Sequence, residues 1–323
     1  MTESEVSLPS DDEGLPSDDE GLLSLVSEDD KPVISKTPSA HIAKRRKTLA
    51  DYGYKKGELR RVPKPKGPSL KCSMDKVGGQ PTIQMWLSQQ ILEMPPSASC
   101  PPDDFLEVFS VPRVVMYCRK LGLRAQRSMD IANGWDLMKK EVKVHAFQEL
   151  AARRPKIVGL TPPCTMFSNL MDLNWYRMDV VERAQALENG IVLLDLAMWI
   201  ALYQMDNQRG FYFEHPAPAK SWKRQAVKRI EHAHGVHKNH FDQCMFGLVS
   251  KVTCTAMKKP TIFLSNVPGI RATFHQCKCM GMHPHQAIEG MEGGEKRSVW
   301  AQKFPPQLCH AIANCVQQHV QCV

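Results

Sequence analysis

The sequence predicts an α/β fold in which a mostly parallel sheet carries helices on both of its faces. From residue 104 onward, short apolar runs alternate with longer amphipathic segments, and this alternation is typical of repeated strand–helix units. Polar or reactive residues directly follow four of the apolar runs, as they do at the carboxyl ends of parallel strands. The 323 residues are enough for one large domain, which we expect after a disordered tail.

The first predicted unit contains two strands and a helix. Residues 105–109 form a short apolar run that suits a buried strand, and Pro112 suits the first turn of the helix that follows. Apolar residues recur at helical spacing over 114–121, which predicts that helix. Residues 123–129 can form a second strand, and this strand ends at Asp130.

The later units repeat the pattern with longer helices. An amphipathic segment over 137–152 predicts a helix that leads to an apolar strand at 156–160. A long apolar stripe over 180–207 predicts the largest helix, and a strand at 210–213 follows it. The remaining predicted elements are a helix at 225–234, a strand at 261–264 and a final helix at 306–318.

The composition changes sharply before the predicted domain. Residues 1–30 hold eleven Asp and Glu but no Lys or Arg, and they contain a tandem repeat of LPSDDEG, which predicts an acidic disordered tail. Residues 31–79 are rich in Lys and Arg without periodic apolar spacing, which predicts a basic disordered linker. The folded domain is therefore expected at 80–323, with a first helix at 80–93 docking on its outside.

The charge of the chain favours nucleic acid as a partner. Residues 72–323 carry a net charge of +8, which suits a polyanion, although a solvated basic surface is the alternative interpretation. The basic cluster 44–47 is of the nuclear-localisation type, so the nucleus is the expected location and the cytoplasm the alternative. No membrane span and no secretory leader are expected, and eleven cysteines without a leader indicate reduced thiols.

The predicted strand ends carry the residues with chemical potential. They are Ser110, Asp130, Cys164 and Glu214. Cys164 is the most distinctive, because Pro162 and Pro163 fix the backbone before it and hold its thiol at the edge of the sheet. Cysteine is a strong nucleophile near neutral pH once its pKa is lowered. A buried structural cysteine after a Pro-Pro turn is the alternative interpretation.

Three segments resemble motifs of the DNA cytosine-5 methyltransferases, and they occur in the order that this family has. Residues 161–168 resemble the proline–cysteine motif, and residues 213–216 resemble the motif whose glutamate contacts cytosine N3. Residues 302–312 resemble the closing motif, which an apolar helix follows. The sequence is also similar to methyltransferase-like modules within retroelement polyproteins.

The resemblance implies a Rossmann-like methyltransferase fold and S-adenosylmethionine-dependent transfer of a methyl group to C5 of cytosine. Cys164 would add to C6 of the base, and Glu214 would protonate N3 and stabilise the charge that develops on the ring. The target base would be flipped out of a duplex or already single-stranded. DNA is expected as the substrate in preference to RNA.

The resemblance also implies a cofactor site at the first strand ends, where Asp130 would bind the ribose hydroxyls. Asp136 would contact the adenine amine, or would instead cap the following helix. The family has a glycine-rich loop after its first strand, whereas residues 109–113 contain no glycine. Lys258 and Lys259 stand only in part for the family's arginine motif. The expected cofactor-binding residues are Phe109, Ser110, Asp130, Asp136 and Pro162.

These departures leave two other function classes open. A catalytically silent relative would use the same fold and basic surface to bind nucleic acid. A zinc-stabilised interaction module is the third candidate, because the sequence groups four soft ligands that could bind zinc tetrahedrally. A Cys/His-rich surface loop is the alternative to a metal site, and Cys244 is expected in the core or as a further ligand. The expected ligands are Cys277, Cys279, His283 and His285.

Overall fold

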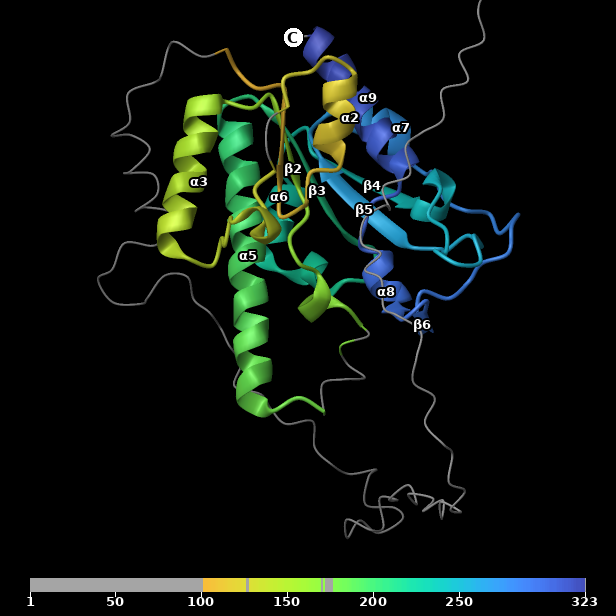
Figure 1. Ribbon diagram of the computed structural model, residues 1–323. Helices are drawn as coiled ribbons and strands as arrows, with labels where there is room; N and C mark the ends of the chain where they lie inside the picture. Colours follow the sequence, from red (N-terminus) through yellow and green to blue (C-terminus); the bar gives the residue numbers. More distant parts are fainter. Residues whose placement is uncertain (1–100, 126–127, 170, 172–176, 323) are drawn as a thin grey trace, which may run out of the picture. The chain divides into compact units, whose positions relative to one another are not determined.

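The apolar runs form a five-stranded sheet in the computed structural model, which describes residues 101–125, 128–169, 171 and 177–322 (Figure 1). All these residues belong to one unit, Val77–Val323. The predicted tail, linker and helix at 80–93 lie outside the described residues. The strands are β1 (Phe105–Val108), β2 (Ile157–Leu160), β3 (Gly210–Pro216), β4 (His237–Asp242) and β5 (Pro260–Ser265), arranged in the order β1-β2-β3-β5-β4.

Four of these five strands point the same way, and β5 is reversed. β1 pairs in parallel with β2 and β2 with β3, whereas β5 lies antiparallel between β3 and β4. The prediction of a mostly parallel sheet is therefore confirmed. The sequence pattern does not predict β4, because His237, Lys238 and His240 interrupt its apolar residues.

The segment expected as a second strand lies along β1 but is joined to it only by isolated bridges. Ala125 pairs with Phe105 and Met129 pairs with Val108, both in the parallel sense. The N–H of Met129 donates to the carbonyl of Glu107 at 2.9 Å. The segment thus lies at the edge of the sheet beside β1, but its described residues do not form the continuous strand that the sequence predicts.

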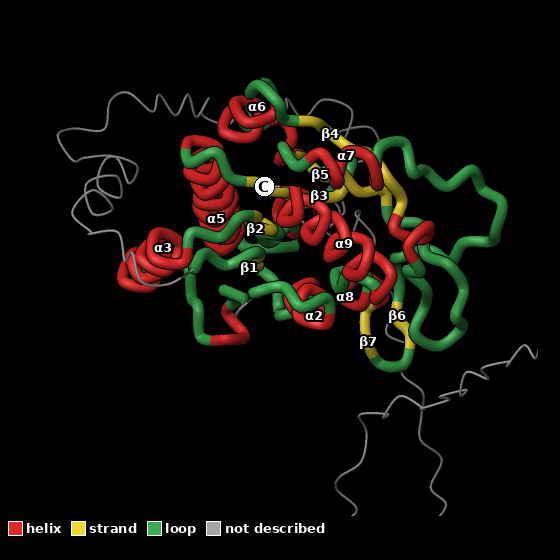
Figure 2. Tube along the Cα trace, turned by 90° about the horizontal axis from the view of Figure 1, so that it is seen from above, coloured by secondary structure: helices red, strands yellow, loops and turns green. Residues whose placement is uncertain are grey.

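Helices cover both faces of the sheet, as predicted (Figure 2). One hydrophobic cluster joins the sheet to α3, α5 and α6, and a second joins it to α2, α7 and α9. Successive residues of a strand point to opposite faces, so Phe211 and Phe213 enter the first cluster while Tyr212 enters the second. The helices are α2 (Val114–Lys120), α3 (Lys140–Arg153), α5 (Val180–Asp206), α6 (Gln225–Glu231), α7 (Pro268–Phe274) and α9 (Pro306–Cys322).

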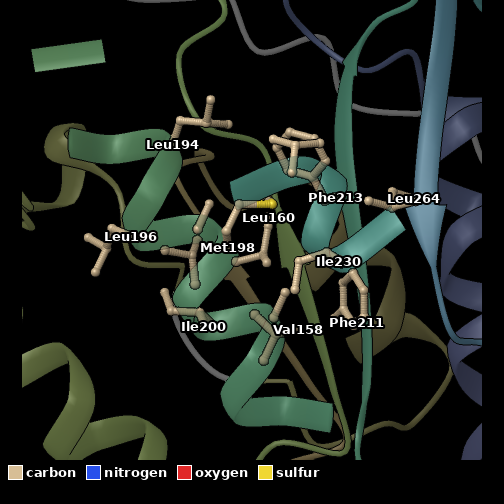
Figure 3. Close-up of a cluster of buried hydrophobic side chains, with 14 of the residues drawn as sticks. Val158, Leu160, Leu194, Leu196, Met198, Ile200, Phe211, Phe213, Ile230 and Leu264 are labelled. Atoms are coloured by element: carbon tan, nitrogen blue, oxygen red, sulfur yellow. The ribbon is translucent and has the colours of Figure 1, made fainter. Parts of the chain in front are cut away.

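The long helix α5 supplies much of the first cluster. It begins after Asp179, whose carboxylate accepts the N–H of Val181 at 2.8 Å and so caps the helix. Figure 3 shows its Leu194 and Met198 beside side chains of β2 and β3. Among the described helices, α5 alone is long and apolar enough to cross a membrane by length and composition. Its buried stripe packs on the sheet in this structure.

Short elements complete the domain beyond the strand ends. Among the described residues, four single-turn helices precede or follow the strands and main helices, and a small hairpin precedes α9. The single turns are η3 (Ile131–Asn133), η4 (Thr165–Phe167), η5 (Lys220–Lys223) and η6 (Gln243–Phe246). The hairpin and the helix after it are β6 (Met291–Glu292), β7 (Glu295–Lys296) and α8 (Arg297–Trp300).

Candidate active site

The carboxyl ends of the parallel strands lie at one level of the sheet. The register pairs Val108 with Leu160 and Leu160 with Phe213, and the bridge from Met129 to Val108 extends this row to the sheet edge. The structure therefore brings the predicted strand ends to one edge. The residues that directly follow this row are Asp130, Phe109, Thr161 and Glu214.

Cys164 lies at this edge with its side chain half-buried, directly before the single turn η4. The carbonyl of Cys164 accepts the N–H of Phe167 at 3.0 Å, and the buried ring of Phe167 anchors the turn in the first cluster. The Cys164 thiol lies in the electrostatic field of Glu214 and Lys259. Burial raises the pKa of the thiol, the Glu214 carboxylate raises it further, and the Lys259 ammonium lowers it.

Glu214 is buried near the end of β3 and forms an ion pair with Lys259. The Lys259 Nζ lies 3.6 Å from Glu214 Oε1, and the two side chains are 14% and 9% exposed. Burial raises the pKa of Glu214, and Lys259 opposes this rise. Oε1 has no hydrogen-bond partner among the described residues. The Lys259 ammonium neutralises its charge from beyond hydrogen-bond distance, so this atom can still accept or share a hydrogen with a polar group of a bound ligand.

His215 ties the loop that carries Cys164 to β3. The carbonyl of Pro162 lies 3.1 Å from Nε2 and can only accept, so Nε2 carries the hydrogen. Nδ1 then accepts the hydroxyl hydrogen of Ser221 at 2.7 Å. Burial lowers the pKa of His215 to about 3, the nearby Lys259 charge acts in the same direction, and the Pro162 carbonyl opposes both. The imidazole is therefore neutral and positions the loop.

Sequence reasoning assigned no role to His215, although the residue is part of the motif that contains Glu214. Lys259 was considered only as a partial substitute for an arginine motif, and the structure places it directly on Glu214. Pro162, which the resemblance assigns to the cofactor, is itself buried, and its carbonyl is occupied by His215. The proximity of these residues depends on strands that are about 50 positions apart in the chain.

The loop after β1 takes a backbone shape that glycine ordinarily supplies. Phe109 has a φ of 65°, in the left-handed region that bulky residues rarely adopt. The buried carboxylate of Glu107 holds the loop by accepting the N–H groups of Arg113 at 3.1 Å and Val115 at 2.9 Å. Ser110 donates its hydroxyl hydrogen to the same carboxylate at 3.3 Å. A buried carboxylate thus shapes the segment in which the resemblance leads one to expect glycines.

Replacing Glu107 by glutamine is expected to flatten the pH dependence of stability. Burial raises the pKa of Glu107 from 4.5 to about 7, opposed by the backbone hydrogen bonds, so the folded protein retains a proton that the unfolded chain releases. The free energy of unfolding of the unmodified protein should therefore fall by about 3 kcal/mol as pH rises from 4.5 to 7. Urea unfolding across this range measures the fall.

The Glu107→Gln variant, which is neutral at every pH and keeps the acceptor oxygen, should lack most of this fall. Its amide group can donate to Ser110, so the loop retains its contacts. Replacing the exposed Glu188 by glutamine is the matched control and should leave the slope unchanged. An unaltered slope in Glu107→Gln would contradict the assignment of the shifted proton to this carboxyl.

The two aspartates expected at the cofactor both cap turns. Asp130 Oδ1 accepts the N–H of Ala132 at 2.9 Å and so caps η3. Asp136 Oδ1 accepts the N–H of Met138 at 3.1 Å. The alternative role of Asp136 as cap of the following helix is wrong, because α3 begins after Lys139 and Asp136 caps the turn before it.

A Cys/His cluster near the end of β4 could hold a metal such as zinc. One ligand atom from each of four residues lies within 4.8 Å of all the others, and the four residues are Cys244, Cys279, His283 and His285. Cys277, expected as a ligand, is not in this cluster and is replaced by Cys244. Cys277 follows the buried end of α7, and its side chain packs against the second hydrophobic cluster.

No protein-family model matches this chain, and no curated protein matches it in sequence. The functional inference therefore depends on the site residues and on the short motifs that contain them.

Proposed function

We propose that this domain is an S-adenosylmethionine-dependent methyltransferase with a Rossmann-like fold. Within that class, we propose that it methylates C5 of cytosine in nucleic acid through a covalent adduct with Cys164. The sheet with four strands in one direction and helices on both faces supports the class. The observation that carries the particular activity is the placement of Cys164, Glu214 and Lys259 in one electrostatic environment at the strand ends.

In the proposed reaction, Cys164 is the nucleophile. Its thiol first loses a proton to solvent, and the sulfur then forms a bond to C6 of cytosine. The electron pair of the C5–C6 bond moves toward C5 and the ring. The positive charge of Lys259 favours the thiolate, since it opposes the rise in the pKa of Cys164 that burial and Glu214 cause. At the end of the reaction C5 gives its proton to solvent, the electron pair of that C–H bond restores the C5–C6 double bond, and the sulfur leaves C6 as the Cys164 thiolate.

Glu214 is proposed to act on the opposite side of the base. Its raised pKa favours the protonated carboxyl, which can donate a hydrogen bond and a proton to N3 as charge develops on the ring. Oε1, which has no hydrogen-bond partner among the described residues, is the oxygen suited to this contact. The proton returns to Glu214 when the aromatic ring is restored.

S-adenosylmethionine supplies the methyl group when it is bound. The residues suited to hold it are at the ends of β1 and of the edge segment: the left-handed turn at Phe109, the Ser110 hydroxyl and the carboxylates of Asp130 and Asp136. The turn at Phe109 supports this assignment, because its φ of 65° lies in the left-handed region that glycine most often occupies.

The proposed substrate is DNA in preference to RNA, and the proposed location is the nucleus. A net charge of +8 over residues 72–323 supports a polyanionic partner. The target cytosine has to leave the base stack to reach Cys164. A module of this kind would act in a retroelement.

A second candidate function is nucleic-acid binding without catalysis. The observation that favours it is the loop after β1, where Glu107 and side chains at 109–113 occupy the position of a glycine-rich loop. Calorimetric titration of the full chain with S-adenosylmethionine separates the two candidates. Binding supports the methyltransferase, and the absence of binding by folded protein supports the silent relative.

The decisive experiment is covalent trapping with DNA that contains 5-fluorocytosine. Fluorine at C5 cannot leave as a proton, so the sulfur–C6 bond should persist after methyl transfer. The full chain, incubated with S-adenosylmethionine and a pool of substituted duplexes, should give a product that withstands denaturing electrophoresis. Cys164→Ser should abolish this product, whereas a variant of the exposed Cys254, Cys254→Ser, should retain it. A product that survives in Cys164→Ser would exclude Cys164 as the nucleophile.

A further inference from the structure

Two cysteines and two histidines come together where β4 ends. Cys244 belongs to η6, which directly follows β4, while the other three belong to the segment after α7. Cys279 Sγ lies 3.5 Å from His283 Nε2 and 3.4 Å from His285 Nε2. The four side chains thus converge from segments that are more than thirty residues apart.

These separations match a tetrahedral metal site. With bonds from zinc of about 2.3 Å to sulfur and about 2.0 Å to nitrogen, a tetrahedral angle separates the sulfur and nitrogen ligands by about 3.5 Å. The two distances at Cys279 lie close to this value. Thiolate and imidazole ligands in equal number are typical of structural zinc.

The backbone around Cys279 is fixed from both sides. Its N–H donates to the carboxylate of Asp242 at 2.9 Å, and its carbonyl accepts Lys258 Nζ at 3.4 Å. The N–H of Gly281 donates to Cys279 Sγ at 3.4 Å, in a turn where Gly281 has a φ of 80°. Partners of this kind orient ligands toward a metal, and glycine permits the turn.

The segment that carries the histidines is an irregular loop. It contains no helix or strand over 275–290, and its Met280 and Met282 are 85% and 90% exposed. The loop is already attached to the domain through Cys277 and Gln286, and a bound metal ion would add a further attachment at its histidines.

We infer that Cys244, Cys279, His283 and His285 bind one zinc ion in a closed, four-ligand structural site. The ion joins the segment after α7 to the end of β4. The neighbouring lysines connect this site to the candidate active site: Lys258 pairs with Asp242 at 3.8 Å, and Lys259 pairs with Glu214 at 3.6 Å. The zinc site does not depend on methyl transfer, because its ligands are separate from Cys164.

Metal analysis of the full chain, purified from zinc-supplemented culture, tests the inference. The unmodified protein should contain one zinc per chain, and so should the matched control Cys277→Ser. Cys244→Ser and Cys279→Ser should each weaken zinc binding at least about tenfold. A folded protein without zinc, or an equal loss in Cys277→Ser and Cys244→Ser, would overturn the inference.

Two measurements on the unmodified chain apply even if the variants do not fold. Cobalt in place of zinc should give the visible absorption of a tetrahedral ion together with charge-transfer bands from two thiolates; an octahedral spectrum would count against the site. Removing the metal with a chelator should expose the segment 275–290 to limited proteolysis, and zinc but not magnesium should restore its protection. Proteolysis that is unaffected by the chelator would contradict a structural role.

Discussion

Replacing Lys259 by methionine is expected to slow covalent trapping at Cys164 by about 100-fold. The ammonium of Lys259 opposes the rise in pKa of both Cys164 and Glu214. Without it, the pKa of the thiol rises further and less thiolate is present at neutral pH. The pH at which trapping reaches half of its maximal rate should therefore shift upward, which a pH profile with 5-fluorocytosine DNA would measure.

The same substitution should also lower the free energy of unfolding, by about 1–3 kcal/mol, because the buried Glu214 carboxyl loses its partner and is driven further toward its neutral form. The double variant Lys259→Met/Glu214→Gln removes both charges and should recover much of this stability without recovering trapping. Lys251→Met, at an exposed lysine, is the control and should change neither property. Trapping by Lys259→Met at the unmodified rate would show that this ion pair plays no part in activating the nucleophile.

Acidification is expected to destabilise the protein strongly through His215. Burial holds its pKa at about 3, whereas the unfolded chain titrates at its ordinary 6.5. Below pH 6.5 the unfolded chain takes up a proton that the folded protein does not. The stability that the neutral imidazole contributes is therefore present above pH 6.5 and is lost as pH falls toward 3, by about 5 kcal/mol in total.

His215→Gln should remove most of this acid dependence, since its amide stays neutral and can still donate to the Pro162 carbonyl. Urea unfolding at several values between pH 7.5 and about pH 4 measures the effect. His232→Gln, at an exposed histidine, is the matched control and should retain the unmodified slope. The expectation fails if His215→Gln and the unmodified protein lose stability in parallel.

The rate of covalent trapping by 5-fluorocytosine DNA distinguishes a positioning role of His215 from a purely structural one. His215→Ala lacks the donor to Pro162, so the loop that holds Cys164 loses its attachment to β3. Its trapping rate should fall clearly, whereas His215→Gln should retain most of the unmodified rate. Equal trapping by the alanine and glutamine variants, both folded, would limit His215 to a role in stability.

The local sequence was sufficient to predict much of the fold. β1, β2 and β3 are buried on both faces, so they appear as apolar runs that are interrupted only by Glu107 in β1 and by the polar end of β3, and α5 and α9 follow from apolar spacing. The position of Cys164 and Glu214 beside strand ends follows from the same runs, because parallel strands end at one edge. The polar strand β4 gives no such signal.

The sequence by itself determined most of the core strands and helices and which residues follow the strand ends, but it predicted neither β4 nor α7. The tertiary structure alone decided the reversal of β5, the contacts of Lys259 and His215, and the replacement of Cys277 by Cys244 in the metal cluster. An apolar run has the same pattern in either direction, and the partner of a charged or sulfur-containing side chain depends on packing between distant segments. The spacing of apolar residues shows which side of a single helix or strand is buried. These contacts depend instead on how separate helices, strands and loops pack against one another.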